Sequence, residues 1–357
     1  MRRLKGLSGI RGLLAIFVAL SHSYSHFTGW GTGFNFFRNA TFAVDIFFIL
    51  SGIVLYYNYK EKISNKKIGV ISFLIVRFFR LYPLHIFAVL LIPLCLFISQ
   101  GEFFPEWIGT LSKRGVVGDL TLLSNLGGMK PFFNPPTWSI STEFYIGSIV
   151  VLLACYSFVF VFIALIASVI LFYITGANVG DITQSYYTII SGGMIRCLFG
   201  ISLGILSHSI SKLLFEKYPS FNKIYKALIY ISFSTLLVII VGVKLSTLQY
   251  FAAMITISLG VGLLPLVDNK LTDLFESNWL YEAGERSYSI YLLHTPVIYI
   301  FLIFKGESLN HNIAFATLAV CATVAISGLA HRYIEKPFIN LSKRLIIKGV
   351  TPVNKTK

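Results

Sequence analysis

The sequence has 357 residues, of which 55% are hydrophobic, 15% aromatic and only 13% charged. Together with a mean hydropathy of +0.75, this composition excludes a soluble globular domain and indicates a polytopic membrane protein. The 30 Lys and Arg against 15 Asp and Glu give a net charge of +15. In a membrane protein this excess is typical of basic cytoplasmic loops, so we expect no nucleic-acid partner.

Ten apolar runs are long enough to cross a membrane as helices. We predict spans near residues 10–26, 41–57, 81–99, 141–156, 157–174, 193–209, 227–243, 248–267, 288–304 and 313–330. The first run follows basic residues as a signal peptide does, but no small-residue cleavage site closes it, so we interpret it as a retained helix. The predicted fold class is an all-α polytopic membrane protein of about ten transmembrane helices. Residues 1–357 are expected to form one membrane-embedded domain.

The distribution of positive charge predicts the orientation of the chain. If the N-terminus is cytoplasmic, 20 Lys and Arg lie on the inner side, six in outer loops and four at or within spans. This asymmetry places both termini in the cytoplasm and the long loop 100–140 outside. The four cysteines lie in apolar runs without CxxC spacing, which predicts neither a disulfide framework nor a zinc site.

Arg11 and His22 stand at the two ends of the first apolar helix. Eleven residues make three helical turns plus roughly 20°, so the two side chains share one face about 16 Å apart along the axis. An ionisable group inside a span normally faces a protein interior or a water-filled cavity. His22 is therefore a candidate functional residue, with a core histidine satisfied by a neighbouring hydroxyl as the alternative.

Asp45 enters the second span from the outer side, roughly 8 Å deep and close to the depth of His22. A carboxylate at that depth would hold the imidazole tautomer and raise its basicity. The alternative is an exposed aspartate that caps the second helix.

Arg77 and Arg80 open the third span at the cytoplasmic face. Arginines at i and i+3 form a fork that suits a phosphate-rich ligand, whereas the alternative is a pair of positive-inside anchors. Arg196 and Glu143 lie near the starts of two further spans, where either could be a helix-end group. Arg196 is the harder of the two to explain in that way.

The sequence contains no nucleotide-binding loop, HExxH, GxSxG or EF-hand pattern. A histidine base without an evident nucleophile favours direct transfer to a hydroxyl over a covalent serine enzyme.

Six motifs in order along the chain resemble the acyltransferase-3 family of integral membrane O-acyltransferases. They are Arg11-x10-His22, the aspartate and FFxxSG stretch from Asp45 to Gly52, RxxR at Arg77 and Arg80, the WSxSxE stretch from Trp138 to Glu143, SYSxYLxH from Ser287 to His294, and IEKPF from Ile334 to Phe338. The resemblance covers nearly the whole chain and agrees with ten spans and cytoplasmic termini.

The resemblance implies transfer of an acyl group, expected to be acetyl, from acyl-coenzyme A (acetyl-CoA) to a hydroxyl of a bacterial surface glycan. His22 would be the general base, assisted by Asp45 and Glu143, with Arg11 near the donor side. Arg77 and Arg80 would hold coenzyme A phosphates, and Arg196 is also assigned to the donor. A thioester donor needs no metal, and none is expected.

The same resemblance implies a multi-pass protein of the bacterial cytoplasmic (inner) membrane, in contact with membrane lipids and with a glycan acceptor that can be lipid-linked. Capsule, O-antigen or exopolysaccharide would be the acceptor class. The alternative function is a transporter or exporter of a lipid-linked sugar or small solute, because buried Arg, Asp and His also line transport paths. Such transporters often contain an internal repeat, and no repeat is evident in this sequence.

Overall fold

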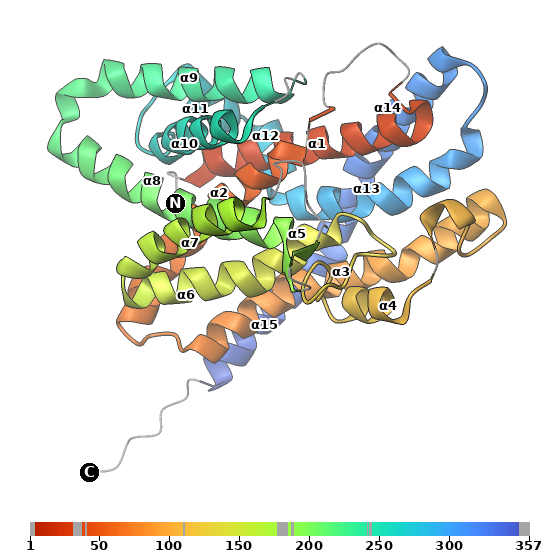
Figure 1. Ribbon diagram of the computed structural model, residues 1–357, viewed down its shortest axis with the longest axis horizontal. Coiled ribbons are helices and arrows are strands. Elements are labelled where there is room, and N and C mark those ends of the chain that lie inside the picture. The colour runs from red at the N-terminus through yellow and green to blue at the C-terminus, as the bar shows by residue number, and fades with distance from the viewer. Residues whose placement is uncertain are drawn as a thin grey trace.

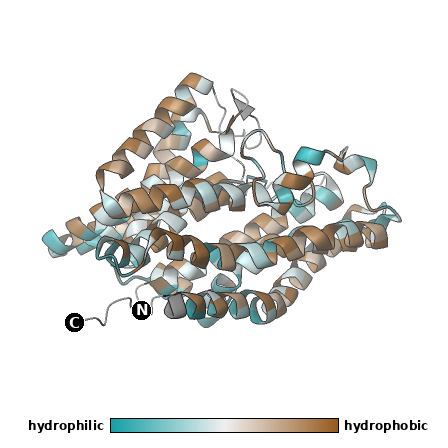
Figure 2. Cartoon of the chain, turned by 90° about the horizontal axis from the view of Figure 1, so that it is seen from below, coloured by the Kyte–Doolittle hydropathy of each residue, from teal (hydrophilic) through white to brown (hydrophobic). Residues whose placement is uncertain are grey.

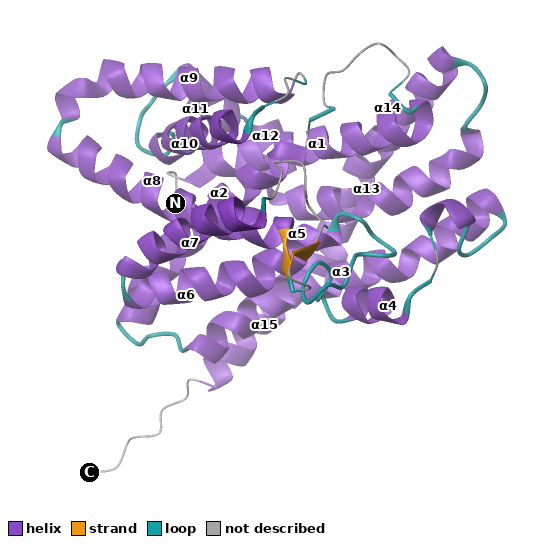
Figure 3. Cartoon of the chain, in the orientation of Figure 1, coloured by secondary structure: helices purple, strands orange, loops and turns teal. Residues whose placement is uncertain are grey.

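The structure is a computed structural model that describes residues 4–30, 38–39, 41–109, 111–176, 185–186, 189–240, 242 and 245–349. The backbone in these ranges is almost entirely helical, as Figure 3 shows. Strands within them are limited to β1 (Ser185–Tyr186) and β2 (Ile190–Ser191), which pair antiparallel. The prediction of an all-α polytopic membrane protein is confirmed.

Eight helical segments of the described chain are long and apolar enough to cross a membrane. They are α1 (Lys5–Thr28), α2 (Thr41–Ser64), α3 (Val70–Gln100), the segment Thr137–Tyr156, α8 (Gly192–Lys217), and the segments Pro219–Ile240, Ser287–Phe304 and Leu309–Leu345. Two shorter apolar helices of 17 residues, α7 (Val159–Thr175) and α10 (Thr247–Leu263), account for the remaining two predicted spans. Each of the ten predicted runs therefore overlaps one of these helical segments.

The other elements complete these segments or connect them. The remaining α-helices are α4 (Lys113–Leu120), α5 (Thr137–Thr142), α6 (Ser148–Tyr156), α9 (Asn222–Ile240), α11 (Lys270–Phe275), α12 (Asn278–Glu285), α13 (Ser287–Phe301), α14 (Leu309–Ala330) and α15 (Lys336–Gly349). Short 3₁₀ turns are η2 (Glu106–Ile108), η4 (Pro219–Phe221) and η5 (Leu302–Phe304). The turns η3 (Glu143–Gly147) and η6 (His331–Glu335) are π-helical, a conformation that occurs frequently at functional sites.

The helix ends and connecting turns gather at two opposite ends of the bundle. Figure 1 places the start of α1, the end of α15 and the α8–α9 turn toward the left end, and the α13–α14 turn at the opposite end. Figure 2 shows hydrophobic residues along the helices and hydrophilic residues gathered toward their ends. This arrangement agrees with the predicted placement of both termini on one side.

Close contacts with α11 and α12 fix the first half of α1. A Cβ added at Gly12 would lie 2.6 Å from the backbone nitrogen of Gly284, and one added at Gly9 would lie 2.0 Å from the carbonyl oxygen of Phe275. Only glycine permits this approach, because any side chain would overlap the backbone of the neighbouring helix. The contact covers one face of α1, and Arg11 between the two glycines lines a cavity on another.

Helices α2 and α8 pack equally closely through glycines of α8. A Cβ at Gly204 would lie 2.1 Å from the carbonyl oxygen of Ile49, and one at Gly200 would lie 3.2 Å from the carbonyl oxygen of Asp45. Small residues let helix backbones approach in membranes, where van der Waals packing drives association. This approach brings Arg196 of α8 within reach of Asp45.

The segment before α5 is held by one buried carboxylate. Asp119 of α4 is 0% exposed and accepts hydrogen bonds from the backbone N–H groups of Phe132 and Phe133 at 2.9 and 2.7 Å, and from the hydroxyls of Ser124 and Thr137. Burial raises the pKa of this carboxyl above its usual value, against the lowering effect of the four hydrogen bonds. Asp119 therefore fixes where the chain enters α5 and η3, the elements that carry Ser139 and Glu143.

Candidate functional site

A cavity of about 200 Å³ lies beside Arg11. We call it the arginine cavity, and its lining comes from α1, α2, α3, η3 and α13: Arg11, Ser51, Val54, Leu55, Asn58, Tyr59, Lys62, Val76, Arg77, Arg80, Leu81, Glu143 and Tyr288. Four of these side chains are basic and one is acidic. A concave site with such a surplus of positive charge suits an anionic ligand.

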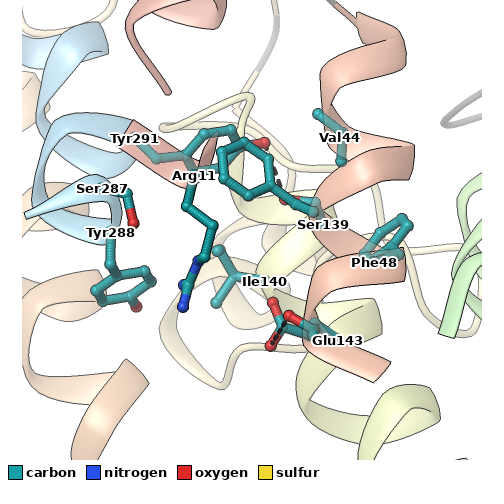
Figure 4. Close-up of a pocket in the computed structure, with 11 residues that line it drawn as sticks. Arg11, Val44, Phe48, Ser139, Ile140, Glu143, Ser287, Tyr288 and Tyr291 are labelled. Carbon is teal, nitrogen blue, oxygen red and sulfur yellow. Dashed lines mark hydrogen bonds between the residues drawn. The ribbon is translucent and has the colours of Figure 1, made fainter. Parts of the chain in front are cut away.

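Arg11 is a partly buried cation of this cavity whose charge has no fixed partner among the described residues. Figure 4 shows its guanidinium between Tyr288 and Glu143, pointing into the space between α1, α2 and α13. Among the described residues the guanidinium forms no hydrogen bond or ion pair, although Glu143, Glu285 and Glu335 are close enough to act on it electrostatically. A partly buried arginine with five free donors is prepared to bind carboxylate or phosphate oxygens.

Arg77 and Glu143 form an ion pair at the wall of the arginine cavity. The Nη2 of Arg77 donates to Glu143 Oε1 at 3.1 Å and to the Glu143 carbonyl oxygen at 3.2 Å, and Ser51 donates to the same Oε1 at 3.1 Å. The side chains of Arg77 and Glu143 are 4% and 19% exposed. Arg77 is thus fixed by protein groups, whereas Arg80, one turn further, is exposed and has no ion pair among the described residues.

A second, narrower cavity continues inward from the arginine cavity. We call it the tyrosine cavity; it has a volume of about 30 Å³ and shares Arg11, Ser51, Glu143 and Tyr288 with its neighbour. Its other lining residues are Val44, Phe47, Phe48, Ser139, Ile140, Ser287 and Tyr291. The hydroxyls of Ser139 and Tyr291 are hydrogen-bonded at 2.9 Å (Figure 4). A narrow, mostly apolar passage therefore leads from the cationic cavity into the bundle.

Two histidines meet beyond the tyrosine cavity. His22 Nδ1 lies 2.8 Å from His294 Nε2, and the two rings are tilted by 52°. His294 is 0% exposed, and its ring lies 5.9 Å from that of Tyr291, which lines the tyrosine cavity. If His22 Nδ1 donates this hydrogen bond, the lone pair is on His22 Nε2, where it can accept a proton. His22 therefore has the arrangement of an oriented base, with an imidazole in the place where a carboxylate was predicted.

Asp45 contacts a different residue from the one predicted. Both of its oxygens accept from Arg196, with Nε at 2.8 Å from Oδ1 and Nη2 at 2.6 Å from Oδ2. Asp45 is 1% exposed, so neither the contact with His22 nor the exposed helix cap describes it. Depth along the membrane normal does not determine which neighbour a helix face meets. The close α2–α8 packing directs Asp45 toward α8.

Arg196 was predicted to bind the donor, and the structure places it elsewhere. It is 1% exposed in the α2–α8 interface, paired with Asp45, and it lines neither the arginine nor the tyrosine cavity. A buried charge pair of this kind satisfies both partners within the apolar interior. We therefore do not include Arg196 in the candidate donor site.

The structure brings together four of the other predicted residues and adds several that were not predicted, whereas His22 lines neither the arginine nor the tyrosine cavity. Arg11, Arg77, Arg80 and Glu143 line one cavity, as expected for parts of one site. His294, Tyr288 and Tyr291 were not assigned roles from the sequence. Their spacing carries a signal, because residues at i, i+3 or i+4, and i+7 share a helix face. Ser287, Tyr291 and His294 have this spacing.

No metal centre is evident among the described residues, since no group of three or more His, Cys, Asp or Glu side chains is placed to hold an ion. The acid–base groups of this part of the chain are instead the histidine pair and the Arg77–Glu143 pair.

Comparison with known proteins adds an independent observation. A family description, "Acyltransferase domain", matches residues 4–332. "Protein 2 in picA locus" of Rhizobium radiobacter is 38% identical over 160 residues, which cover 40% of this chain and 78% of that protein. "Acyltransferase MdmB" of Streptomyces mycarofaciens is 32% identical over 154 residues, or 40% of this chain and 37% of that protein. No solved structure matches the chain significantly.

These matches decide between the two functions that the sequence left open. The family match spans α1 to η6 and therefore includes every element that lines the arginine and tyrosine cavities. A membrane transporter of lipid-linked sugars is not supported by it. The chain belongs to the acyltransferase-3 family and is a multi-pass membrane acyltransferase.

Proposed function

We propose that this protein is an O-acyltransferase of the bacterial cytoplasmic membrane that moves an acyl group, acetyl in the simplest case, from acyl-coenzyme A to a hydroxyl of a surface glycan. The whole chain would act as one membrane-embedded domain. The observation that carries the proposal is that Arg11, which has no hydrogen bond or ion pair among the described residues, lines a cavity with surplus positive charge. This cavity adjoins the tyrosine cavity, and the ring of Tyr291, which lines the latter, lies 5.9 Å from that of His294, the partner of His22.

The arginine cavity suits the pyrophosphate of coenzyme A. The guanidinium groups of Arg11 and Arg80 have no ion pair within the part of the chain that the structure describes, and Arg77 is paired with Glu143 at one wall. Guanidinium groups bind phosphate oxygens through two parallel hydrogen bonds, which fixes both position and orientation. The pantetheine arm of the donor, which is slender and uncharged, would then enter the tyrosine cavity.

The separation of Arg11 from His22 assigns them different tasks. Eleven residues of helix place their backbones about 16 Å apart, so one cannot assist at the atom on which the other acts. Arg11 would bind the donor, while His22 would act where the acyl group is transferred. Asp45 and Arg196 would support the fold around this site rather than contact the donor.

The reaction at His22 would be a single displacement. His22 Nε2 accepts the proton of the acceptor hydroxyl as its oxygen attacks the thioester carbonyl carbon; the new C–O bond forms, the C–S bond breaks, and coenzyme A leaves as a thiolate that takes up a proton. Deprotonating the attacking hydroxyl typically contributes about 10²- to 10⁴-fold in rate. The hydrogen bond to His294 would hold the required tautomer.

The proposal is tested with purified protein in nanodiscs, acetyl-coenzyme A labelled in the acetyl group, and crude surface glycan as acceptor. We expect label in the glycan and an equal amount of free coenzyme A thiol. Label that stays on coenzyme A while glycan crosses the bilayer of a proteoliposome would instead support transport.

A further inference from the structure

A third cavity opens between the ends of α2 and α8, at the end of the bundle where the α8–α9 turn lies. We call it the lysine cavity; it has a volume of about 620 Å³. Its walls include Tyr56, Tyr57, Lys60 and Lys62 of α2, and His208 and Lys212 of α8. The arginine and lysine cavities lie on two sides of α2 and share Asn58 and Lys62, so a bent ligand can occupy both.

The three cavities widen in order from the histidine pair outward, with volumes of about 30, 200 and 620 Å³. Coenzyme A has the same order of widths, because its thiol arm is slender, its pyrophosphate is wider and its adenosine is widest. A thioester placed near His22 directs the nucleotide away from the interior, toward the lysine cavity. The sizes of the cavities therefore suit the thiol arm in the tyrosine cavity, the pyrophosphate in the arginine cavity and the adenosine in the lysine cavity.

The chemistry of the lysine cavity suits a purine nucleotide that carries an extra phosphate. Lys60 and Lys62 form no ion pair among the described residues, and their ammonium groups lie over the rings of Tyr56 and Tyr59 at 5.2 and 5.5 Å. Lys212 pairs with Glu216 at 3.9 Å, but both side chains are more than half exposed, so a phosphate can replace that carboxylate. Glu61 and Glu216 also line the cavity, which leaves three lysines against two glutamates.

Aromatic groups supply the surface that an adenine ring requires. Tyr57 is 50% exposed and its ring lies 6.2 Å from that of His208, edge to face. Tyr56 is 6% exposed, and its hydroxyl has no hydrogen-bond partner among the described residues. An adenine ring can stack on the exposed face of a tyrosine ring, and any base can make this contact because each has a π-face.

We propose that the lysine cavity binds the adenosine 3′-phosphate end of acyl-coenzyme A, with Lys60 and Lys212 on the 3′-phosphate and Tyr57 against adenine. This inference rests on the proposed function, because it extends the donor from the arginine cavity into its neighbour. It predicts that the protein distinguishes coenzyme A from its analogue that lacks only the 3′-phosphate.

The test measures binding of coenzyme A and 3′-dephospho-coenzyme A by titration calorimetry, with protein in nanodiscs of neutral phosphatidylcholine. Exposed ammonium groups contribute modestly to phosphate binding, so we expect wild-type protein to bind coenzyme A about 3- to 10-fold more tightly than the analogue. In Lys60→Gln/Lys212→Gln protein this ratio should fall to about 1, with affinity for the analogue unchanged. Lys223→Gln makes a matched control, because Lys223 is exposed on α9 beside the same turn and lines none of the three cavities.

The possible outcomes separate this inference from the proposed function. A wild-type ratio of 1, or a ratio that the double variant leaves unchanged, overturns the nucleotide site while the donor assignment stands. Absence of binding of either compound to wild-type protein overturns the donor assignment itself. If phosphatidylglycerol in the nanodisc removes the preference, the cavity binds an anionic lipid headgroup instead, and the nucleotide assignment is wrong.

Discussion

His22 Nδ1 and His294 Nε2 are 2.8 Å apart, although 272 residues separate them in the chain. The contact joins α1 to α13, and the His294 ring lies 5.9 Å from that of Tyr291, which lines the tyrosine cavity. It leaves His22 Nε2 as the nitrogen available to a substrate, because the other ring nitrogen is already engaged. The arrangement follows the usual logic of an orienting group behind a general base.

Replacing His294 should weaken catalysis without preventing donor binding. In His294→Ala protein, His22 keeps its place on α1 but loses the hydrogen bond that selects its tautomer, so we expect kcat to fall at least about tenfold, less than on loss of the base itself. The measurement is kcat for acetyl transfer beside the dissociation constant of coenzyme A. His294→Gln, which retains a hydrogen-bonding group, should recover part of the rate. Equal activity of His294→Ala and wild-type protein would show that the pair is only a packing contact.

The two arginines of α3 should differ when each is changed to lysine. Arg80→Lys keeps the charge but loses the planar fork, so donor affinity should fall with unfolding temperature unchanged. Arg77→Lys should also lower the unfolding temperature, because Arg77 is 3% exposed and makes two hydrogen bonds to Glu143. Both are measured by coenzyme A titration and thermal unfolding in the same detergent. An Arg80→Lys protein with unaltered donor binding and activity would return Arg80 to the role of a charge anchor.

The Asp45–Arg196 pair should be structural. Asp45→Asn leaves a buried guanidinium without its counter-charge, which typically costs about 3–5 kcal/mol. Replacing both partners, as Asp45→Asn/Arg196→Met, should regain much of that stability because no charge remains buried. We expect the specific activity of the folded fraction of the double variant to stay within severalfold of wild type. A folded double variant with no activity would restore Asp45 or Arg196 to the catalytic site.

The orientation of the chain can be tested with single cysteines. Lys66→Cys in the α2–α3 loop and Lys113→Cys in α4 are both exposed, and the charge asymmetry places them on opposite sides. In a Cys321→Ser background, which removes the exposed native thiol, an impermeant maleimide added to intact cells should label position 113 and not position 66. Labelling of position 66 in intact cells would reverse the assignment of the donor cavity to the cytoplasmic side.

Hydropathy predicted the spans well because burial in lipid requires long apolar helices, and these are recognised in the sequence as long hydrophobic runs. The spacing of polar residues also indicated that Arg11, Arg77 and Arg80 are functional candidates, and these three line one cavity. The partners of buried charges were harder to predict. Helical rise predicted similar depths for Asp45 and His22, but which side chains meet depends on how each helix is rotated and on which neighbour it approaches.

Gly200 and Gly204 illustrate why that step fails from sequence alone. They allow α8 to pack against the backbone of α2, and this contact places Arg196 where it hydrogen-bonds to Asp45. His294 likewise could not be assigned to His22, because helix spacing specifies a face but not the helix opposite. The IEKPF motif shows the same limit. Glu335 in it is 4% exposed and accepts from Ser289 of α13, a contact that spacing does not reveal.

The most direct test of the account is the rate of acetyl transfer by His22→Asn protein. Asparagine is similar in size and can still hydrogen-bond to His294, but it cannot accept the hydroxyl proton, and general-base catalysis typically contributes about 10²- to 10⁴-fold. We expect transfer to fall by at least about a hundredfold with unchanged expression and unchanged coenzyme A affinity. Transfer by folded His22→Asn protein at near wild-type rate would show that His22 is a core residue and would contradict the mechanism.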